Sequence, residues 1–544
     1  MSEDANLTRE GKAEFLRNRG MNPYPTNAED GTHIGTYLAR YSALQADQRS
    51  LETEVIAGRV VGMRDVGSIG FIDVMQEHSR VQLYLHKDAL GESYDILFKG
   101  VDRGDWICAS GKPYRTRRGE LSLEVGRWSM MCKATRELPF GKVDKDGKVR
   151  YSATDPELLR RWPEIRLAID PVAYAAATKR SKLITAVREY YAEHGFLEMP
   201  IPIIEREYGG ASAKPFLTRV NAISGMELPL RISHELTLKR LAVAGFPRVY
   251  HLGPAFRNEG IDADHHPEFQ LVESYAFNQD YFQVMEFFEN LVATAFQKVN
   301  GTTKARFGPN KMDFAPPWRR VTMVDSLKEF GSVDVTRMSD LEMMALAAKC
   351  NPDVLERCKI NPGLPDGELV ERVLKETELP IRKPRGLLIA YLFEQLAEPR
   401  LTQPTFVYDH PKETTPLCKK HRDPRWSESM VERFEAFAGA NLDSNGQIVG
   451  SEIANAYTEL NDPIEQRRRM EEQAKERDAG DEESYPAPEE FIQSIEYGLP
   501  PFGGLGFGLD RLAMILTGDL FPPESPPRIQ ETIFFPVMKP LTKQ

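Results

Sequence analysis

Cysteine is scarce in this chain, and long apolar runs are missing. Five cysteines are scattered singly among 544 residues, with no C-x-x-C pair. This sparse, odd number excludes a disulfide scaffold and is typical of a reducing compartment, so we expect a cytoplasmic protein. The longest purely apolar run, 387–393, is too short to cross a bilayer, and the acidic N-terminus does not have the pattern of a secretory signal. No membrane partner is therefore predicted.

Zinc-binding motifs are missing as well. The sequence contains neither an H-E-x-x-H motif nor four cysteines and histidines at the spacing of a zinc site. A divalent metal would have to be held by carboxylates, which suits Mg²⁺ bound together with phosphates.

Basic residues are outnumbered by acidic ones. With 70 Lys+Arg against 81 Asp+Glu, the formal net charge is −11. Taken alone, this balance argues mildly against a nucleic-acid partner, because binding to phosphates depends on lysine and arginine. The 41% apolar and 28% charged residues are those of an ordinary globular protein.

The N-terminal third predicts a small β-barrel. Five short runs alternate with period two between turns rich in glycine or aspartate: 55–61, 70–74, 80–85, 105–109 and 121–128. Five such strands indicate a five-stranded OB-fold barrel. We therefore expect an N-terminal helical extension (1–50), an OB-fold domain (51–140), a linker (141–160) and a mixed region (161–544) with a mainly helical segment around 335–400.

Polar residues alternate along a predicted β-hairpin at 248–279, whose loop spans 260–267. The alternation places Arg257 and Glu259 on one face of the first strand, and Glu273 and Tyr275 on one face of the second. A carboxylate within such a face needs a partner if it is buried. For this hairpin alone, a structural Arg–Glu pair in a sheet is the better explanation.

Two further segments favour a binding site. In 450–463, the residues Asn455, Tyr457 and Glu459 share one face of a β-like run, whereas Glu452 is out of phase, so it either faces elsewhere or a bulge intervenes. In 503–516, a glycine-rich strand leads into an apolar helix that opens with Asp510 and Arg511. Glycines let a backbone and a ligand approach closely, and an arginine at that junction could reach a nucleotide.

These segments resemble known motifs. FRNEG followed by HHPEF is similar to motif 2 of class II aminoacyl-tRNA synthetases, and GLGFGLDR is similar to motif 3. GSEIANAYTELNDP and HPKETTPL narrow the likeness to the bacterial type of class II lysyl-tRNA synthetase, from about residue 8 to 539. The resemblance implies an α+β protein, in which an N-terminal five-stranded OB-fold β-barrel binds the anticodon and a class II catalytic domain has an antiparallel β-sheet flanked by helices. It also implies a homodimer formed through motif 1, which would be 171–204 with Pro202.

For amino-acid activation, the resemblance implies two catalytic arginines, Arg257 and Arg511. Arg257 would contact both the amino-acid carboxylate and the α-phosphate of ATP, and a planar guanidinium suits both anions. The ATP site would consist of Arg257, Glu259, His265, Phe269 and Arg511. The metal ligands would be Glu435 and Glu452, which would hold Mg²⁺, more than one ion being expected. Between these glutamates the chain has about ten more residues than expected, and Ser451 replaces a usual arginine.

The implied lysine site carries negative charge at both ends, as an extended substrate with two ammonium groups requires. The α-amino group would be held by Gly210, Glu235 and Glu273, the carboxylate by Asn455 with Arg257, and the ε-ammonium by Tyr275 and Glu459, with Tyr457 beside them.

In the OB-fold domain, Phe71, Gln82 and Glu120 match positions that read anticodon bases by stacking and by base-edge hydrogen bonds. Taken alone, Phe71 on a barrel strand is as compatible with the core as with a stacking platform. The basic run 112–118 is a plausible phosphate contact, although taken alone it would be a solvated loop.

The resemblance thus implies a lysine–tRNA ligase, which converts L-lysine and ATP into lysyl-adenylate and pyrophosphate and then transfers lysine to the 3′-terminal adenosine of tRNA(Lys). One alternative is a synthetase-like paralogue that modifies a protein, but such paralogues resemble the catalytic domain without an anticodon domain. The other is a non-catalytic nucleic-acid-binding protein, against which the retained Arg257, Glu259, Glu452 and Arg511 argue.

Overall fold

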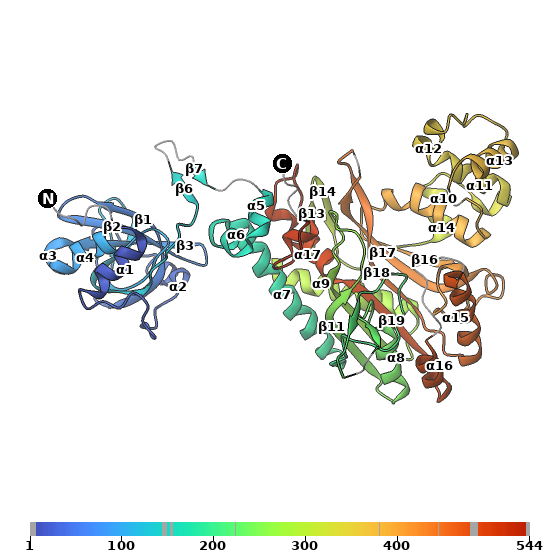
Figure 1. Cartoon of the computed structure of the whole chain (residues 1–544), viewed down its shortest axis with the longest axis horizontal. Helices are drawn as coiled ribbons and strands as arrows, with labels where there is room; N and C mark the ends of the chain where they lie inside the picture. The colour runs from blue at the N-terminus through green and yellow to red at the C-terminus, as the bar shows by residue number, and fades with distance from the viewer. Residues whose placement is uncertain are drawn as a thin grey trace. The chain divides into compact units, whose positions relative to one another are not determined.

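The structure is a computed structural model that describes residues 7–143, 149–152, 156–222, 225–379, 381–443, 445–478 and 488–539. The chain folds into two compact units, Met1–Tyr174 and Ala175–Gln544, whose elements are labelled in Figure 1. Among the described residues, none of the helices combines the length and the apolar character needed to cross a membrane.

The first unit contains a closed five-stranded barrel, as the alternation in the sequence predicted. The strand order is β1-β2-β3-β5-β4, and β1 pairs with both β2 and β4, which closes the barrel. β3 and β5 run parallel, and the other pairs are antiparallel. The elements are α1 (Arg9–Arg17), α2 (Ile34–Arg40), β1 (Glu54–Asp65), β2 (Ile69–Gln76), β3 (Ser79–His86), α3 (Lys87–Leu90), α4 (Glu92–Gly100), β4 (Trp106–Arg115) and β5 (Leu121–Cys132).

The segment expected to be a linker carries regular structure. Strands β6 (Phe140–Val143) and β7 (Val149–Ser152) pair as a hairpin, and the helices α5 (Pro156–Arg161) and α6 (Pro163–Ile169) follow. Residues 144–148 and 153–155, which belong to the same expected linker, lie outside the described residues.

The second unit is built on an eight-stranded sheet of order β15-β16-β17-β18-β19-β12-β11-β8. The six central strands are antiparallel, as expected, but the outermost strands β15 and β8 run parallel to their neighbours, so the sheet is mixed. The strands of this unit are β8 (Leu197–Glu198), β9 (Leu217–Arg219), β10 (Glu227–Pro229), β11 (Arg248–Phe256), β12 (Glu268–Phe277), β13 (Lys304–Phe307), β14 (Asn310–Asp313), β15 (Arg319–Thr322), β16 (Thr405–Pro411), β17 (Met430–Leu442), β18 (Ile448–Thr458) and β19 (Phe502–Gly508).

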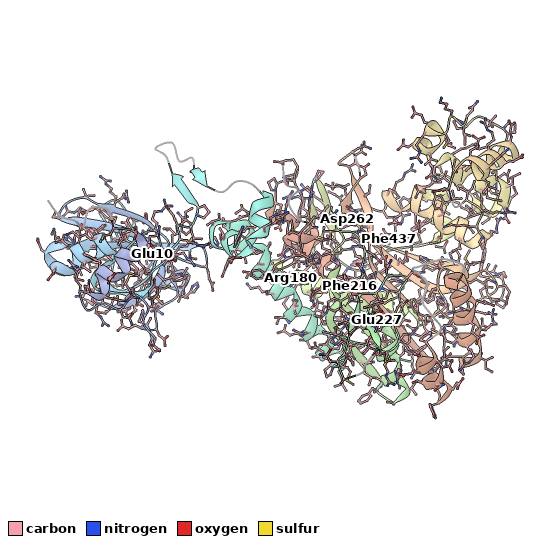
Figure 2. All side chains as sticks on the ribbon, viewed as in Figure 1. Glu10, Arg180, Phe216, Glu227, Asp262 and Phe437 are labelled. Atoms are coloured by element: carbon pink, nitrogen blue, oxygen red, sulfur yellow. The ribbon has the colours of Figure 1, made fainter. Side chains whose placement is uncertain are left out.

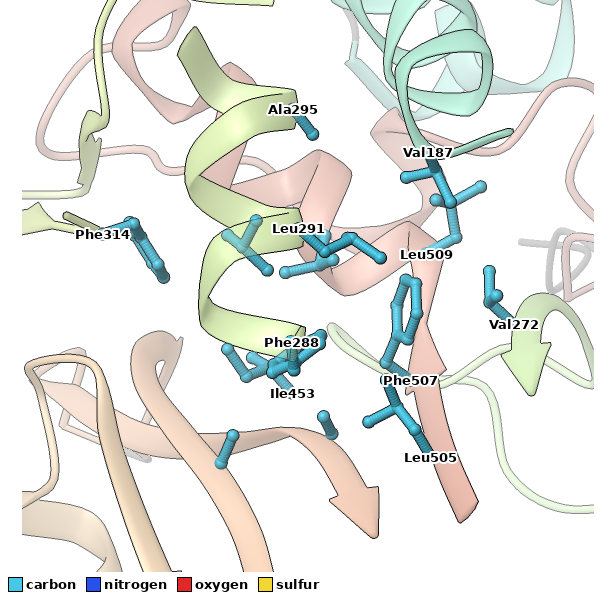
Figure 3. Packing of buried hydrophobic residues seen from close by; sticks show 14 of the residues in the cluster. Val187, Val272, Phe288, Leu291, Ala295, Phe314, Ile453, Leu505, Phe507 and Leu509 are labelled. Carbon is cyan, nitrogen blue, oxygen red and sulfur yellow. The ribbon is translucent and has the colours of Figure 1, made fainter. Parts of the chain in front are cut away.

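Helices pack on both faces of this sheet, and one of the two faces also carries a cleft lined by polar side chains. Phe288 of α9, Leu509 of α17 and Val187 of α7 pack against Phe507 and other apolar residues of the sheet (Figure 3). Along β12 the alternation is strict: Val272 and Ala276 enter this core, whereas Glu273 and Tyr275 face a cleft on the opposite side. The helices of this core are α7 (Pro171–Glu193), α9 (Tyr281–Asn300) and α17 (Leu509–Thr517), whereas α8 (Glu235–Val243), α15 (Pro463–Asp478) and α16 (Glu489–Glu496) pack on the face that carries the cleft.

The region around 335–400 is helical, as predicted, and has a hydrophobic core of its own. Its helices lie together beside β16 in Figure 1: α10 (Met323–Glu329), α11 (Asp340–Lys349), α12 (Pro352–Arg357), α13 (Asp366–Glu376) and α14 (Arg385–Leu396). Phe437 of β17, labelled in Figure 2, packs into this core with its ring centroid 5.5 Å from that of Phe393. This contact attaches the helical region to the central sheet.

Candidate active site

A cleft of about 500 Å³ lies on the face of the sheet that the core helices leave open. Its floor is formed by β12, β18 and β19, and α8 and the segment after β11 contribute to its walls. The lining includes all residues that the sequence suggested for lysine and ATP, together with one suggested metal ligand: Gly210, Glu235, Arg257, Glu259, His265, Phe269, Glu273, Tyr275, Glu452, Asn455, Tyr457, Glu459 and Arg511. The second suggested metal ligand, Glu435, lies on β17 and does not line the cleft.

Arg257 is positioned by the β11–β12 hairpin, but not as a strand residue. The sequence pattern placed Arg257 and Glu259 on the strand, and this was wrong, because β11 ends at Phe256. The Arg257 amide still donates to Pro267 O (2.9 Å), and the Glu259 amide then donates back to Arg257 O (2.9 Å), which turns the chain out of the sheet. The guanidinium of Arg257 lies over the Phe269 ring, 5.1 Å from its centroid. Desolvation within the cleft lowers the pKa of Arg257, which the nearby carboxylates of Glu259 and Glu273 oppose.

Arg511 is aimed into the cleft by the residue before it. The carboxylate of Asp510 is buried and accepts hydrogen bonds from Arg180 Nη2 (2.8 Å) and from the Gln270 amide (2.7 Å); Arg180 is labelled in Figure 2. These bonds fix the start of α17, so that Arg511 Nη1 donates to Glu452 O across the cleft (2.6 Å).

His265 lies in the loop between β11 and β12, beside two carboxylates. Its Nδ1 is 3.0 Å from both Asp262 Oδ1 and Asp264 Oδ1. Although partial burial opposes it, the hydrogen bond with His265 and the charge of Arg511 lower the pKa of Asp264 to about 2. The same contacts raise the pKa of His265, the hydrogen bond with Asp264 being the largest cause. His265 thus presents a half-exposed ring near Arg511, and the neighbouring aspartates favour its protonated form.

A β-bulge explains why Glu452 faces the cleft. Ala436 pairs with Ala454, and the next residue of β17, Phe437, pairs with Glu452, so Ile453 is one residue too many on β18. Ile453, labelled in Figure 3, and Ala454 both enter the core. Of the two explanations that the sequence left open, the bulge is therefore the correct one.

Carboxylates accumulate around Glu452. Burial and the charge of Glu435 raise the pKa of Glu452, and burial together with the charges of Glu435 and Glu452 raises the pKa of Glu398 to about 8. Glu435 is held by Arg433, whose Nη2 donates to its Oε1 (2.5 Å). Glu435 and Glu452 lie on the adjacent strands β17 and β18. Such an excess of carboxylates fits a divalent cation.

Two buried glutamates close the opposite end of the cleft. Glu235 accepts hydrogen bonds from Tyr457 Oη (2.8 Å) and Lys239 Nζ (2.5 Å). Glu459 is 1% exposed, and its Oε2 lies 2.5 Å from Lys239 Nζ, whereas its Oε1 accepts no hydrogen bond from the part of the chain that the structure describes. A buried carboxylate with unused acceptor capacity, facing a cleft, suits a cationic ligand group.

Two glycines make this end of the cleft possible. A Cβ on Gly504 would lie 1.9 Å from Glu459 Oε1, so only glycine leaves room for that carboxylate. Gly210 has a φ of +83°, and a Cβ there would lie 2.3 Å from Ser233 Oγ. Both positions therefore require the close approach that glycine permits.

Glu273 lies between the two ends of the cleft. Its Oε2 accepts a hydrogen bond from the His234 amide (3.1 Å). Burial and the charge of Glu235 nevertheless raise its pKa to about 8. In the free protein, the cations near Glu273 therefore do not offset the effects of burial and of Glu235 on its pKa.

Sequence reasoning missed two cations of this site, Arg433 and Lys239. Arg433 donates to Asn455 Oδ1 (3.1 Å) and to Thr414 Oγ1 (3.0 Å) in addition to Glu435, so it links a suggested substrate ligand to a suggested metal ligand. Period two along β17 places Arg433 and Glu435 on one face, a signal available in the sequence. Lys239 follows Glu235 by four residues on α8, the spacing of an i,i+4 pair.

On the barrel, Phe71 is half-buried and lies outside the hydrophobic core. Its ring is 5.4 Å from Tyr84, whose ring is 5.5 Å from that of Tyr114. The guanidinium of Arg64 lies 5.5 Å from the Phe71 ring centroid. Gln82 Oε1 accepts from Ser122 Oγ (3.2 Å), and Glu120 is exposed in the turn between β4 and β5. Aromatic rings flanked by arginines on an outer face can stack nucleic-acid bases.

Comparison with known proteins gives matches over almost the whole chain. The family described as tRNA synthetases class II (D, K and N) matches residues 157–539, and the family described as OB-fold nucleic acid binding domain matches 55–130. The chain is 37% identical to the lysine–tRNA ligase of Clostridium perfringens over 99% of its own length and 97% of the relative. The lysine–tRNA ligase of Listeria monocytogenes is 38% identical, with 98% and 97% covered. That of Thermoanaerobacter sp. is 37% identical, with 98% and 95% covered.

Proposed function

Because this chain belongs to the class II lysine–tRNA ligases, we propose that the cleft over β12, β18 and β19 is where it activates L-lysine. Lysine and ATP give lysyl-adenylate and pyrophosphate, and lysine then passes to the 3′-terminal adenosine of tRNA(Lys). The observation that carries the assignment is Glu459, a buried carboxylate that faces the cleft and whose Oε1 accepts no hydrogen bond from the described residues. It would accept the ε-ammonium of lysine together with Tyr275, and Glu235, Glu273 and Gly210 would hold the α-amino group.

The other end of the cleft supplies positive charge for the reaction. A carboxylate oxygen of lysine attacks the α-phosphorus of ATP, a P–O bond forms, and pyrophosphate leaves. Two anions must approach each other, so guanidinium groups that offset the developing charge stabilise the transition state. Arg257, assisted by Asn455, would hold the lysine carboxylate against the α-phosphate. Arg511 and Phe269 would enclose the adenine.

The carboxylates near Arg511 fit the Mg²⁺ that class II ligases commonly use with ATP. Glu452 and Glu435 would hold the ion, and Glu398 lies close enough for the charges of both to raise its pKa. The raised pKa values of Glu452 and Glu398 support the fit, because a divalent cation would relieve the mutual repulsion of these groups. When bound, the ion would neutralise phosphate charge. Glu259 and His265 would contact ATP beside it.

The remaining assignments concern the tRNA, the assembly and the compartment. Phe71, Gln82 and Glu120 of the barrel would read the anticodon, and a barrel of this kind favours a tRNA ligase over a paralogue that modifies proteins. Motif 1 would form a homodimer, which is supported by exposed apolar side chains in and near it: Leu197, Ile203, Ile204, Leu217 and Met226. The scarcity of cysteine supports a cytoplasmic location.

ATP–pyrophosphate exchange with a panel of amino acids tests this proposal. We expect exchange that depends on L-lysine and is lost with L-norleucine, which has the same carbon chain as lysine but lacks the ε-ammonium group. Exchange that is equally fast with norleucine would contradict the role given to Glu459. Loss of exchange on replacing Glu452 by Gln at low Mg²⁺, with partial recovery at high Mg²⁺, would support the metal assignment.

Lysine should bind more tightly as the pH rises toward 8. The pKa of Glu273 is raised to about 8 in the free protein, and a bound ammonium group would lower it, so binding releases a proton. At pH values below this raised pKa, each unit by which the pH falls should therefore increase the Kd for lysine by up to about tenfold. Calorimetric titration between pH 6 and 8, in buffers of different ionisation enthalpy, measures both the Kd and the proton release. A Glu273→Gln variant should have a shallower dependence, and a flat wild-type profile would contradict the account.

A further inference from the structure

Lys239 places a fully buried ammonium group directly behind the proposed lysine site. Its Nζ donates to Glu235 Oε1 (2.5 Å) and lies 2.5 Å from Glu459 Oε2. The side chain of Lys239 is 1% exposed, and those of Glu235 and Glu459 are 4% and 0% exposed. Because water cannot screen this trio, its charges act on one another strongly.

The charges of the site do not balance without Lys239. Three buried carboxylates, those of Glu235, Glu273 and Glu459, line this part of the cleft. The substrate brings two ammonium groups, and its own carboxylate would be met by Arg257. One of the three glutamates would therefore be left as a buried charge without a cation, which is strongly unfavourable. Lys239 supplies the third positive charge.

Lys239 does this without occupying the space of the substrate. Glu235, Glu459 and Tyr457 line the cleft, whereas Lys239 is not among the lining residues. Its Nζ lies 5.5 Å from the ring centroid of Tyr457 and 5.7 Å from that of Tyr275. The ammonium group thus contacts the glutamates from the side that faces away from the cleft.

We propose that Lys239 is a positioning residue for lysine recognition, whose fixed ammonium group offsets the buried negative charge of Glu235 and Glu459 and holds both carboxylates oriented toward the two ammonium groups of the substrate. This inference rests on the proposed lysine site and adds the group that makes that site electrically complete. Burial opposes the charged form of Lys239, but the charges of Glu235 and Glu459 outweigh it and raise its pKa. The titratable groups that interact with the trio are Glu273, Tyr275, Cys418 and Tyr457. Two further cations act on these groups: Arg257 on Glu273, and Arg433 on Cys418 and Tyr457.

A Lys239→Met variant tests the proposal through its pH profile. The methionine side chain is nearly isosteric but lacks the charge, so Glu459, whose pKa is raised by burial and lowered by Lys239, should bind a proton at a higher pH than in the wild type. We expect the KM for lysine in ATP–pyrophosphate exchange to rise about tenfold or more at pH 7 and to recover toward pH 9, with the KM for ATP unchanged. The matched control is Arg240→Met, an adjacent and 47% exposed cation on the same helix, which should leave the profile as in the wild type.

A charge-balanced pair of variants covers the case in which Lys239→Met does not fold. Glu235→Gln and the double variant Glu235→Gln/Lys239→Met differ only in the ammonium group of Lys239. The buried net negative charge of the site in either variant is smaller than in Lys239→Met. The proposal predicts a pH midpoint of the lysine KM that is about one unit or more higher in the double variant than in Glu235→Gln. Equal midpoints would overturn the role of Lys239. If wild-type exchange showed no saturable dependence on lysine, the proposed site itself would fail.

Discussion

Replacing Arg511 with alanine should abolish detectable lysyl-adenylate formation while the protein stays folded. Arg511 is 24% exposed, lies in the cleft and donates to Glu452 O, so its loss removes a cation from the proposed ATP site. A single transition-state donor of this kind contributes about 10²–10³-fold in rate. Because Arg511 would also enclose the adenine, we expect a decrease at the upper end of that range or beyond it. The measurement is lysine-dependent ATP–pyrophosphate exchange at saturating lysine.

The matched control is Arg337→Ala, which removes an arginine of the same unit that is 86% exposed and pairs with Asp334 outside the cleft. It should exchange like the wild type. Thermal unfolding of Arg511→Ala should stay close to that of the wild type, because Asp510, and not Arg511, anchors the start of α17. Wild-type-like exchange by Arg511→Ala would refute the role assigned to this arginine.

Glu459→Gln should raise the KM for lysine by about 10²-fold or more with little effect on the KM for ATP. Truncating one partner of a buried charge pair costs about 2–5 kcal/mol, and an amide presents only one acceptor oxygen to an ammonium group. Discrimination against norleucine should decrease in parallel, because a neutral amide is less costly to leave unpaired than a buried carboxylate. Exchange rates measured over a range of lysine and norleucine concentrations give both quantities.

Glu496→Gln serves as the control for this change, because it neutralises an exposed glutamate that pairs with Arg467 on the surface. Its kinetic constants should match those of the wild type. An unchanged KM for lysine in Glu459→Gln would mean that another group holds the ε-ammonium.

The parts of the fold that follow from short-range patterns could be predicted from the sequence. Alternation gave the five barrel strands and the hairpin of β11 and β12, and the glycine-rich run before Leu509 gave the junction of β19 and α17. These features depend on residues that are close in the chain, so the pattern contains the information. The parallel outer strands β8 and β15 could not be predicted, because their partners are distant in sequence.

The site was predictable only where local geometry stayed regular. The alternation predicted that Arg257 belongs to a strand, but this strand ends one residue earlier because the turn at Glu259 redirects the chain. The bulge at Ile453 places Glu452 in the cleft, and no feature of the sequence indicates which residue of β18 lacks a partner on β17. Lys239 contacts Glu459 across more than two hundred residues, a proximity that only the packing of α8 against the sheet creates.

The net charge of −11 was a poor guide to the partner. It is a sum over the chain, and several of the acidic groups gather in one cleft: Glu235, Glu273, Glu452 and Glu459. The proposed base stacking on the barrel would need only local cations such as Arg64, whose guanidinium lies over Phe71. Electrostatic attraction acts within a Debye length of about 10 Å, so local charge matters more than the total.

A crystal structure of the protein with L-lysine bound tests the central claim most directly. The account predicts that the ε-ammonium lies within hydrogen-bond distance of Glu459 and Tyr275, that the α-amino group contacts Glu235 and Glu273, and that Lys239 keeps its contacts with Glu235 and Glu459. Lysine bound in the reverse orientation, or with its ε-ammonium away from Glu459, would contradict it.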